Sequence, residues 1–326
     1  MFQLSRRNAL KLMTAGALAP LAMPTIARAA GETIRIVYPY AGGSAVNNII
    51  RMIADNMSKT LGQTVILEDK PGGNGIVATQ SVARGPKDGT MVLVGATGTL
   101  PLNTLLRSAL PYKIEDFQPV GMMLEGPLTV TVNTKTAPVD DMKSLVEWAK
   151  ERNKPLHYAT LGPGSVTHLF GVLFSKATGL PSAPVAYRNN NAQILDLLAG
   201  QNDLNFSTPA SLIEHEKSGE VKMLAVTTSD RMARLPDTPT VVEAGYPGLL
   251  CSFWYSLMVP TGTPDDTVTR LNEALNIALQ DAGIRERMEA ECLTNNPGAP
   301  TAVTSILERD MKVWGDIIRS EGITLN

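Results

Sequence analysis

The residues best placed for chemistry are Gly42, Gly43 and Ser44, which interrupt an apolar run near the start of the chain. Residues 34–37 are mostly β-branched and predict a strand, and residues 47–61 carry apolar side chains at helical spacing. This order directs the backbone N–H groups of the turn and the positive end of the helix at one point. The arrangement suits an anion, but a plain tight turn uses the same residues.

A second glycine-rich turn follows the predicted strand 156–159 and precedes the predicted helix 167–178. The N–H groups around Gly164 could form a second cradle, and Ser165 could cap the helix or meet a ligand oxygen. His168 could donate to a ligand or serve only the scaffold. Ser165 and His168 also offer a nucleophile and a base, but no third group to orient the base and no oxyanion hole is indicated.

Other motifs carry less information. Arg188, in a polar turn, could pair with a carboxylate or remain an exposed loop arginine. Residues 73–78 match the dinucleotide pattern G-x-G-x-x-A only loosely, because Lys70 and Pro71 separate them from their strand. Zinc-protease, C-x-x-C, phosphate-loop and nucleophile-elbow motifs do not occur in the sequence. We therefore expect no cofactor, no metal and no catalytic residue.

An alternating pattern of strands and helices must position these turns. It runs over residues 34–95 and again over residues 128–226, which predicts two sets of βαβ units with largely parallel sheets. Residues 265–321 are mostly helical. The chain passes between the two sets near residues 125–129 and 249–255. If the C-terminal helices rejoin the first set, two crossing strands form a hinge with a ligand cleft.

We therefore expect an α/β protein with two lobes. Residues 31–127 and 254–326 form lobe 1, and residues 128–253 form lobe 2. The length of 326 residues, with 44% hydrophobic and 18% charged side chains, suits such a soluble globular protein.

The first 30 residues are interpreted as a cleavable export signal. Arg6 and Arg7 precede a moderately apolar stretch that ends in an A-x-A motif. The segment is similar to a twin-arginine signal, but Ala9 replaces a bulky apolar residue of that motif, so the general secretory route stays open. The apolar stretch is shorter than the about 20 residues that span a bilayer, which disfavours a membrane anchor. We expect cleavage near Ala29/Ala30 and export.

The net charge limits the classes of partner, and the cysteine content limits the possible disulfides. Without the first 30 residues the chain has 25 basic and 31 acidic residues, a net charge of −6, which argues against nucleic acid as a partner. An anionic ligand is still compatible, because local dipoles and single cations decide its binding. The two cysteines, Cys251 and Cys292, could form a disulfide or remain buried thiols.

Several ordered blocks of the chain then resemble one family. The segment from Y-P-Y-A-G-G-S through Arg51 resembles the family block P-F-x-x-G-G-x-x-D-x-x-A-R, and D-K-P-G-G-N-G at residues 69–75 resembles N-K-P-G-A-G-G. Farther along, G-S-V-T-H-L at residues 164–169 resembles G-S-x-x-H-L, and V-P-T-G-T-P at residues 259–264 resembles A-P-A-G-T-P. On these blocks the chain resembles the Bug-type periplasmic solute receptors of tripartite tricarboxylate transporters.

The resemblance implies a type II periplasmic binding protein fold, with two α/β lobes joined by two crossing strands around a ligand cleft. It implies a carboxylate ligand, such as a di- or tricarboxylate, an amino acid or an aromatic acid, held by facing loops of the two lobes. The site residues that it implies are Tyr40, Ala41, Gly42, Gly43, Ser44, Asn47, Thr97, Thr99, Gly164, Ser165, His168, Tyr187, Arg188 and Asn189.

One departure from the family pattern bears on the ligand. Asn47 stands where the family usually has Asp, an acid that can meet the ammonium group of an amino-acid ligand. Its loss makes a simple amino acid a poorer candidate than an uncharged or purely anionic substrate.

The sequence thus predicts a periplasmic receptor that delivers a small carboxylate to membrane subunits of a tripartite tricarboxylate transporter. We expect a monomer that binds no nucleic acid. Two alternatives stay open: a hydrolase that uses Ser165 and His168, and a ligand sensor that partners a signalling kinase.

Overall fold

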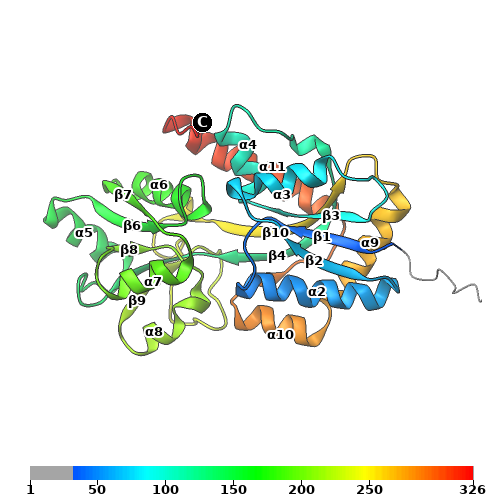
Figure 1. Ribbon diagram of the computed structural model, residues 1–326. Coiled ribbons are helices and arrows are strands. Elements are labelled where there is room, and N and C mark those ends of the chain that lie inside the picture. Colours follow the sequence, from blue (N-terminus) through cyan, green and yellow to red (C-terminus); the bar gives the residue numbers. More distant parts are fainter. Residues whose placement is uncertain (1–31, 326) are drawn as a thin grey trace, which may run out of the picture.

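The computed structural model describes residues 32–325, and the expected export signal lies outside this range. Within the range the chain forms two α/β lobes, as expected, and Figure 1 shows them side by side with strands β4 and β10 running between them. None of the helices among residues 32–325 has the length and apolar character to cross a membrane.

Lobe 1 is built on a sheet with the strand order β11-β4-β10-β3-β1-β2. Its strands are β1 (Ile34–Tyr38), β2 (Val65–Asp69), β3 (Met91–Ala96), β4 (Phe117–Pro127), β10 (Ser252–Pro260) and β11 (Thr294–Asn295). Its helices are α2 (Ala45–Leu61), α3 (Ile76–Ala83), α4 (Asn103–Leu106), α9 (Asp265–Leu279), α10 (Ala282–Ala290) and α11 (Thr301–Ser320).

Lobe 2 is built on a sheet with the strand order β7-β6-β8-β5-β9. Its strands are β5 (Thr129–Asn133), β6 (Leu156–Thr160), β7 (Ser182–Ala186), β8 (Leu204–Asn205) and β9 (Val221–Val226). Its helices are α5 (Met142–Arg152), α6 (Val166–Thr178), α7 (Asn190–Leu198) and α8 (Ile213–Lys217).

Strand direction determines which loops face the other lobe. β10 is antiparallel to both β3 and β4, so β4 runs in the same direction as β1, β2 and β3. Because β4 leads directly into β5, the C-terminal ends of β1, β2 and β3 point toward lobe 2. β5 then runs away from the hinge, and β8 is antiparallel to β5 but parallel to β6, which is parallel to β7. The C-terminal ends of β6, β7 and β8 therefore point toward lobe 1.

The first strand shows how lobe 1 is packed. Ile34 and Ile36 lie in one apolar cluster with Ile49 and Ile53 of α2, whereas Val37 lies in another cluster, on the side of α3. Alternate residues of β1 thus bury themselves against helices on both faces, as in a parallel sheet covered on both sides. The i, i+4 spacing of the α2 isoleucines turns their side chains to one face of that helix.

The C-terminal helix α11 packs on both lobes. Val303 and Ile306 near its start lie in a lobe 1 cluster, whereas Trp314 and Ile317 near its end lie in a cluster with Phe170 of α6. The expected division placed this whole helix in lobe 1. Sequence periodicity reveals the apolar face of a helix but not the element against which it packs. The residue boundaries of the two lobes remain a prediction.

Some features were not predicted from the sequence. β4 is a strand of 11 residues, and β3 is followed by a π-helical turn, Gly98–Leu102. Cys251 and Cys292 form no disulfide with each other, so the alternative of two unpaired thiols holds. Burial raises the pKa of both thiols.

Candidate functional site

The predicted site residues lie in four segments at the facing edges of the two sheets. The segments of lobe 1 follow β1 and β3, and those of lobe 2 follow β6 and β7. All four leave strand ends that point toward the other lobe. Open α/β sheets bind ligands outside such C-terminal strand ends.

The first segment connects β1 to α2 through a capped helix start. Gly43 has a φ of +89°, in the left-handed region that favours glycine. The Ser44 hydroxyl oxygen accepts the N–H of Asn47 at 3.0 Å and so caps α2. The N–H groups of Ala45 and Val46 belong to the same first turn, where no intrahelical acceptor exists. Ala41 and Gly42 are exposed beside them.

The buried side chain of Asn47 is hydrogen-bonded to this turn. Its side chain is 1% exposed, its Oδ1 accepts the N–H of Gly43 at 3.3 Å, and its Nδ2 donates to Oδ1 of Asp69 at 2.7 Å. The resemblance suggests a ligand contact at this position. Both side-chain polar atoms of Asn47 thus bond within lobe 1, one of them to an acid that sequence reasoning did not connect with it.

Thr97 and Thr99, in the segment after β3, are also buried. Thr97 is 1% exposed and its hydroxyl oxygen accepts the N–H of Trp254 at 2.9 Å. Thr99 is fully buried, and its hydroxyl oxygen accepts the N–H of Ala96 at 3.1 Å. These two side chains hold the segment in place rather than line its surface.

Three tyrosines lie together beside the first turn, and only one of them, Tyr40, was among the predicted site residues. The ring centroids of Tyr38, Tyr40 and Tyr255 are 5.7 to 6.3 Å apart. Tyr40 and Tyr255 are half-buried, and burial raises the pKa of all three phenols, so they stay neutral. Tyr255 lies in β10, whereas its two tyrosine neighbours lie at the end of β1 and just after it, far away in the sequence.

In lobe 2, Ser165 caps α6 within a cluster of hydroxyl groups. Its oxygen accepts the N–H of His168 at 3.2 Å and lies 2.9 Å from the hydroxyl of Thr160 and 3.1 Å from that of Thr167. Gly164, with a φ of +78°, packs against Leu325 near the end of the chain. The cap therefore resembles that of α2 and comes from the opposite lobe.

His168 faces this turn as a neutral imidazole. Burial lowers its pKa, and its Nδ1 lies 3.3 Å from the N–H of Gly164, which donates to it. This bond leaves the proton of the neutral ring on Nε2. The ring thus pairs with the backbone of Gly164, whereas the Ser165 hydroxyl contacts the backbone of His168. The arrangement needed for a hydrolase is not formed between these two residues.

The segment after β7 combines internal and exposed groups. The hydroxyl of Tyr187 donates to Asp196 at 2.8 Å and accepts from Asn202 at 2.7 Å. Asn189 caps α7 by accepting the N–H of Ala192 at 3.0 Å, whereas Arg188 is exposed. Arg188 is therefore the cation that this segment presents to solvent.

Helix ends supply the electrostatics of this edge. α2, α6 and α7 begin here, and their first turns contain no acidic residue. By contrast, α9 begins at the opposite edge of the lobe 1 sheet and carries Asp265 and Asp266 in its first turn. A helix N-terminus without an acid in its first turn favours an anion by about 0.3–1 kcal/mol, and by more when partly buried. The starts of these three helices therefore favour negative charge.

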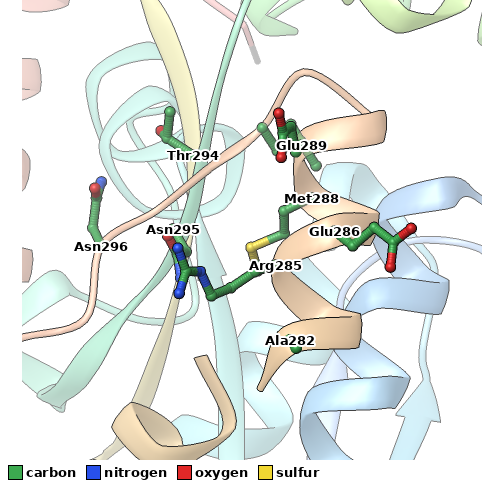
Figure 2. A pocket seen from close by; sticks show the side chains of 9 residues that line it. Ala282, Arg285, Glu286, Met288, Glu289, Thr294, Asn295 and Asn296 are labelled. Carbon is green, nitrogen blue, oxygen red and sulfur yellow. The ribbon is translucent and has the colours of Figure 1, made fainter. Parts of the chain in front are cut away.

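A hollow of about 600 Å³ lies elsewhere, between α10 and β11 (Figure 2). Figure 2 shows Arg285 extending from α10 toward Asn295. None of the predicted site residues lines it. Over residues 32–325, no three His, Cys, Asp or Glu side chains group in a way that could hold a metal ion.

Known proteins are similar to this chain in sequence and architecture. BugT from Bordetella pertussis is 29% identical over 316 residues, which cover 96% of each chain. The structure of Rpa4515 from Rhodopseudomonas palustris with adipate superposes with a TM-score of 0.80 at 28% identity, covering 90% of this chain and 98% of that one. MatC from the same organism, with bound malate, gives a TM-score of 0.77 at 27% identity, covering 88% and 98%.

A match to a whole family extends over most of the chain. Residues 49–323 match the tripartite tricarboxylate transporter family receptor, TctC. The match includes both lobes, both crossing strands and α11. Together with the two-lobed fold, it establishes that the chain belongs to the tripartite tricarboxylate transporter receptor family.

Proposed function

We propose that this protein captures a small carboxylate between its two lobes and presents it to the membrane subunits of a tripartite tricarboxylate transporter. The observation that carries the proposal is the pair of serine-capped helices, α2 and α6, which begin at facing edges without an acid in their first turns. Adipate and malate, bound by Rpa4515 and MatC, are both dicarboxylates, which supports this ligand class.

Backbone donors would hold the charge. We assign one ligand carboxylate to the first-turn N–H groups of α2, next to Gly42 and Ser44, and assign the facing turn at Gly164 to the same ligand. Each charge-assisted hydrogen bond contributes about 1.5–3 kcal/mol. Micromolar affinity needs about 8 kcal/mol, so a few such bonds with some apolar burial suffice.

Side chains would select the rest of the ligand. Tyr40 and Tyr255, which are half-buried, are assigned to the carbon skeleton, and Arg188 to a second carboxylate. The Nε2–H of His168 is a further donor. Asn47, Thr97, Thr99, Tyr187 and Asn189 are assigned to positioning, since their hydrogen bonds lie within their own lobes.

The remaining expectations belong to the same proposal. Residues 1–30 are removed on export, and the mature chain acts in the periplasm as a monomer without catalytic activity. The receptor family and the separate hydrogen bonds of His168 and Ser165 support a binding role. Closure would move the two lobes, divided at residues 127/128 and 253/254, about β4 and β10.

Thermal shift of purified residues 31–326 tests the ligand class. The panel contains malate, succinate, adipate, citrate, glutamate and benzoate, with glucose and putrescine as a neutral and a cationic control. A carboxylate at 100 times its Kd should stabilise the protein by about 2.7 kcal/mol. Stabilisation by glucose or putrescine, and by no carboxylate, would overturn the proposal.

A blocking variant tests the position of the site. Ser44→Tyr places a large ring at the exposed start of α2 and should abolish the carboxylate-induced shift. Ser108→Tyr, at another exposed serine of lobe 1, is the matched control and should keep the shift. An unchanged shift in Ser44→Tyr would remove this turn from the site.

A further inference from the structure

We propose that Asp69 is a positioning residue of the candidate ligand loop and that it acts through Asn47. The proposal rests on the proposed function, because it gives Asp69 a role in presenting the turn at Gly42 and Gly43 to a carboxylate. Asp69 itself need not touch the ligand.

A continuous chain of hydrogen bonds connects Asp69 to the turn. Asp69 is the last residue of β2, and its Oδ1 accepts from Nδ2 of Asn47 at 2.7 Å. Oδ1 of Asn47 in turn accepts the N–H of Gly43 at 3.3 Å. Because Asn47 is 1% exposed, solvent cannot easily replace either bond. The orientation of the Asn47 amide therefore depends on the acceptor at position 69.

The second carboxylate oxygen of Asp69 supports the same turn by contact. It lies so close to Gly42 that a methyl group there would collide with it. Nη2 of Arg51 lies 3.7 Å from this oxygen and offsets its charge. The carboxylate can therefore lie beneath an anion-binding turn with little repulsion of the anion.

The residue types are informative as a pair. Asp69 can only accept hydrogen bonds when ionised, so Asn47 must direct its Nδ2 toward it and its Oδ1 toward Gly43. With the types exchanged, a carboxylate at position 47 could accept both from Gly43 and from an amide at position 69. One acid and one amide thus support the turn in either order.

Four variants separate the hydrogen bond from the charge. Asp69→Ala removes the acceptor, whereas Asp69→Asn keeps an acceptor and removes the charge. Asn47→Asp brings two carboxylates together, and the double variant N47D/D69N restores an acid–amide pair. Glu68→Ala, one residue earlier on β2, is the matched control.

Two readouts are measured on each variant of residues 31–326. The first is amide hydrogen exchange of Gly43 in the ligand-free protein, followed by ¹H–¹⁵N NMR. The second is the Kd for malate and for adipate by calorimetry. Exchange should accelerate at least tenfold in Asp69→Ala and Asn47→Asp, and Kd should rise at least tenfold. Asp69→Asn, N47D/D69N and Glu68→Ala should stay within threefold of wild type in both readouts.

The outcomes distinguish this proposal from the proposed function. Wild-type exchange at Gly43 in Asp69→Ala, or failure of N47D/D69N to rescue Asn47→Asp, overturns the positioning role. Tighter anion binding by Asp69→Ala also overturns it, because the acid would then repel the ligand. If wild type binds neither dicarboxylate, the choice of ligand fails, but the exchange measurement still decides the role of Asp69.

Discussion

At the scale of single residues, polar side chains at the facing edges mostly hold loops in place. Thr97, Thr99 and Asn47 are buried and hydrogen-bonded within lobe 1, and Ser165 caps its own helix. The groups left for the proposed ligand are largely backbone N–H groups, exposed glycines and half-buried tyrosines. Backbone donors recognise charge and shape, so they suit a family whose members bind different acids.

His168 makes this residue-level view testable by pH. Burial lowers its pKa, so the unfolded chain, with a pKa of about 6.5, binds a proton more readily than the folded protein does. The stabilising contribution of neutral His168 is complete above pH of about 6.5 and is lost as the pH falls. Protonation also turns Nδ1 from an acceptor into a donor, which breaks its bond with Gly164.

The measurement compares the Tm of wild type and His168→Gln from pH 7.5 down to pH 5. We expect the wild-type advantage to shrink as the pH falls. His157→Gln, at an exposed histidine 3.7 Å from Asp203, should not reproduce this trend. Parallel curves for wild type and His168→Gln would contradict the assignment.

At the scale of elements, the candidate site is formed by the starts of helices. α2 and α6 share a serine cap, a preceding positive-φ glycine and a first turn without acids. Each follows a strand whose C-terminal end points to the other lobe. An acid at such a helix start would improve the cap but occupy the positive end that we assign to the ligand.

Replacing the cap of α6 separates these two effects. Ser165→Asp and Ser165→Asn should have similar stability, because both side chains are good caps, whereas Ser165→Ala should lose about 1 kcal/mol. For malate, Ser165→Asp should bind at least about tenfold more weakly than Ser165→Asn, which is about 1.4 kcal/mol. Calorimetry measures the Kd for malate, and urea unfolding measures the free energy of unfolding. Equal affinities of the two variants would show that the end of α6 carries no ligand charge.

At the scale of the whole molecule, α11 packs against both lobes and so connects them in addition to the crossing strands. Asp310 of α11 accepts a hydrogen bond from the indole Nε1 of Trp254 in β10 at 2.7 Å. Farther along, Trp314 is 2% exposed within the cluster that includes Phe170. Leu325, after the helix, packs on Gly164 and donates its N–H to the carbonyl of Leu106 at 2.8 Å.

Loss of the packing of α11 on lobe 2 should destabilise both lobes. Trp314→Ala removes a buried ring and should cost about 3–5 kcal/mol of unfolding free energy in urea. Val313→Ala, at its exposed neighbour, should change stability by less than about 0.5 kcal/mol. Hydrogen exchange in Trp314→Ala should accelerate in α6 of lobe 2 and in the first half of α11. Acceleration confined to one lobe would contradict the coupling.

Much of the architecture followed from local patterns in the sequence. A β-branched run predicted β1, the strand predicted over residues 156–159 is β6, and apolar spacing predicted α2 to within a few residues. Two glycine turns marked the loops at the facing edges, and the alternation of elements indicated two α/β lobes. Local periodicity suffices here because strand and helix geometry repeat every two or 3.6 residues.

Only the tertiary structure decided how those loops use their atoms. It joined Asn47 to Asp69, brought Tyr255 to Tyr40, buried the hydroxyls of Thr97 and Thr99, and packed the end of α11 on lobe 2. These contacts connect residues that are distant along the chain or that belong to different elements. Periodicity shows that a side chain is buried or polar, but its hydrogen-bond partner depends on which elements the fold brings together.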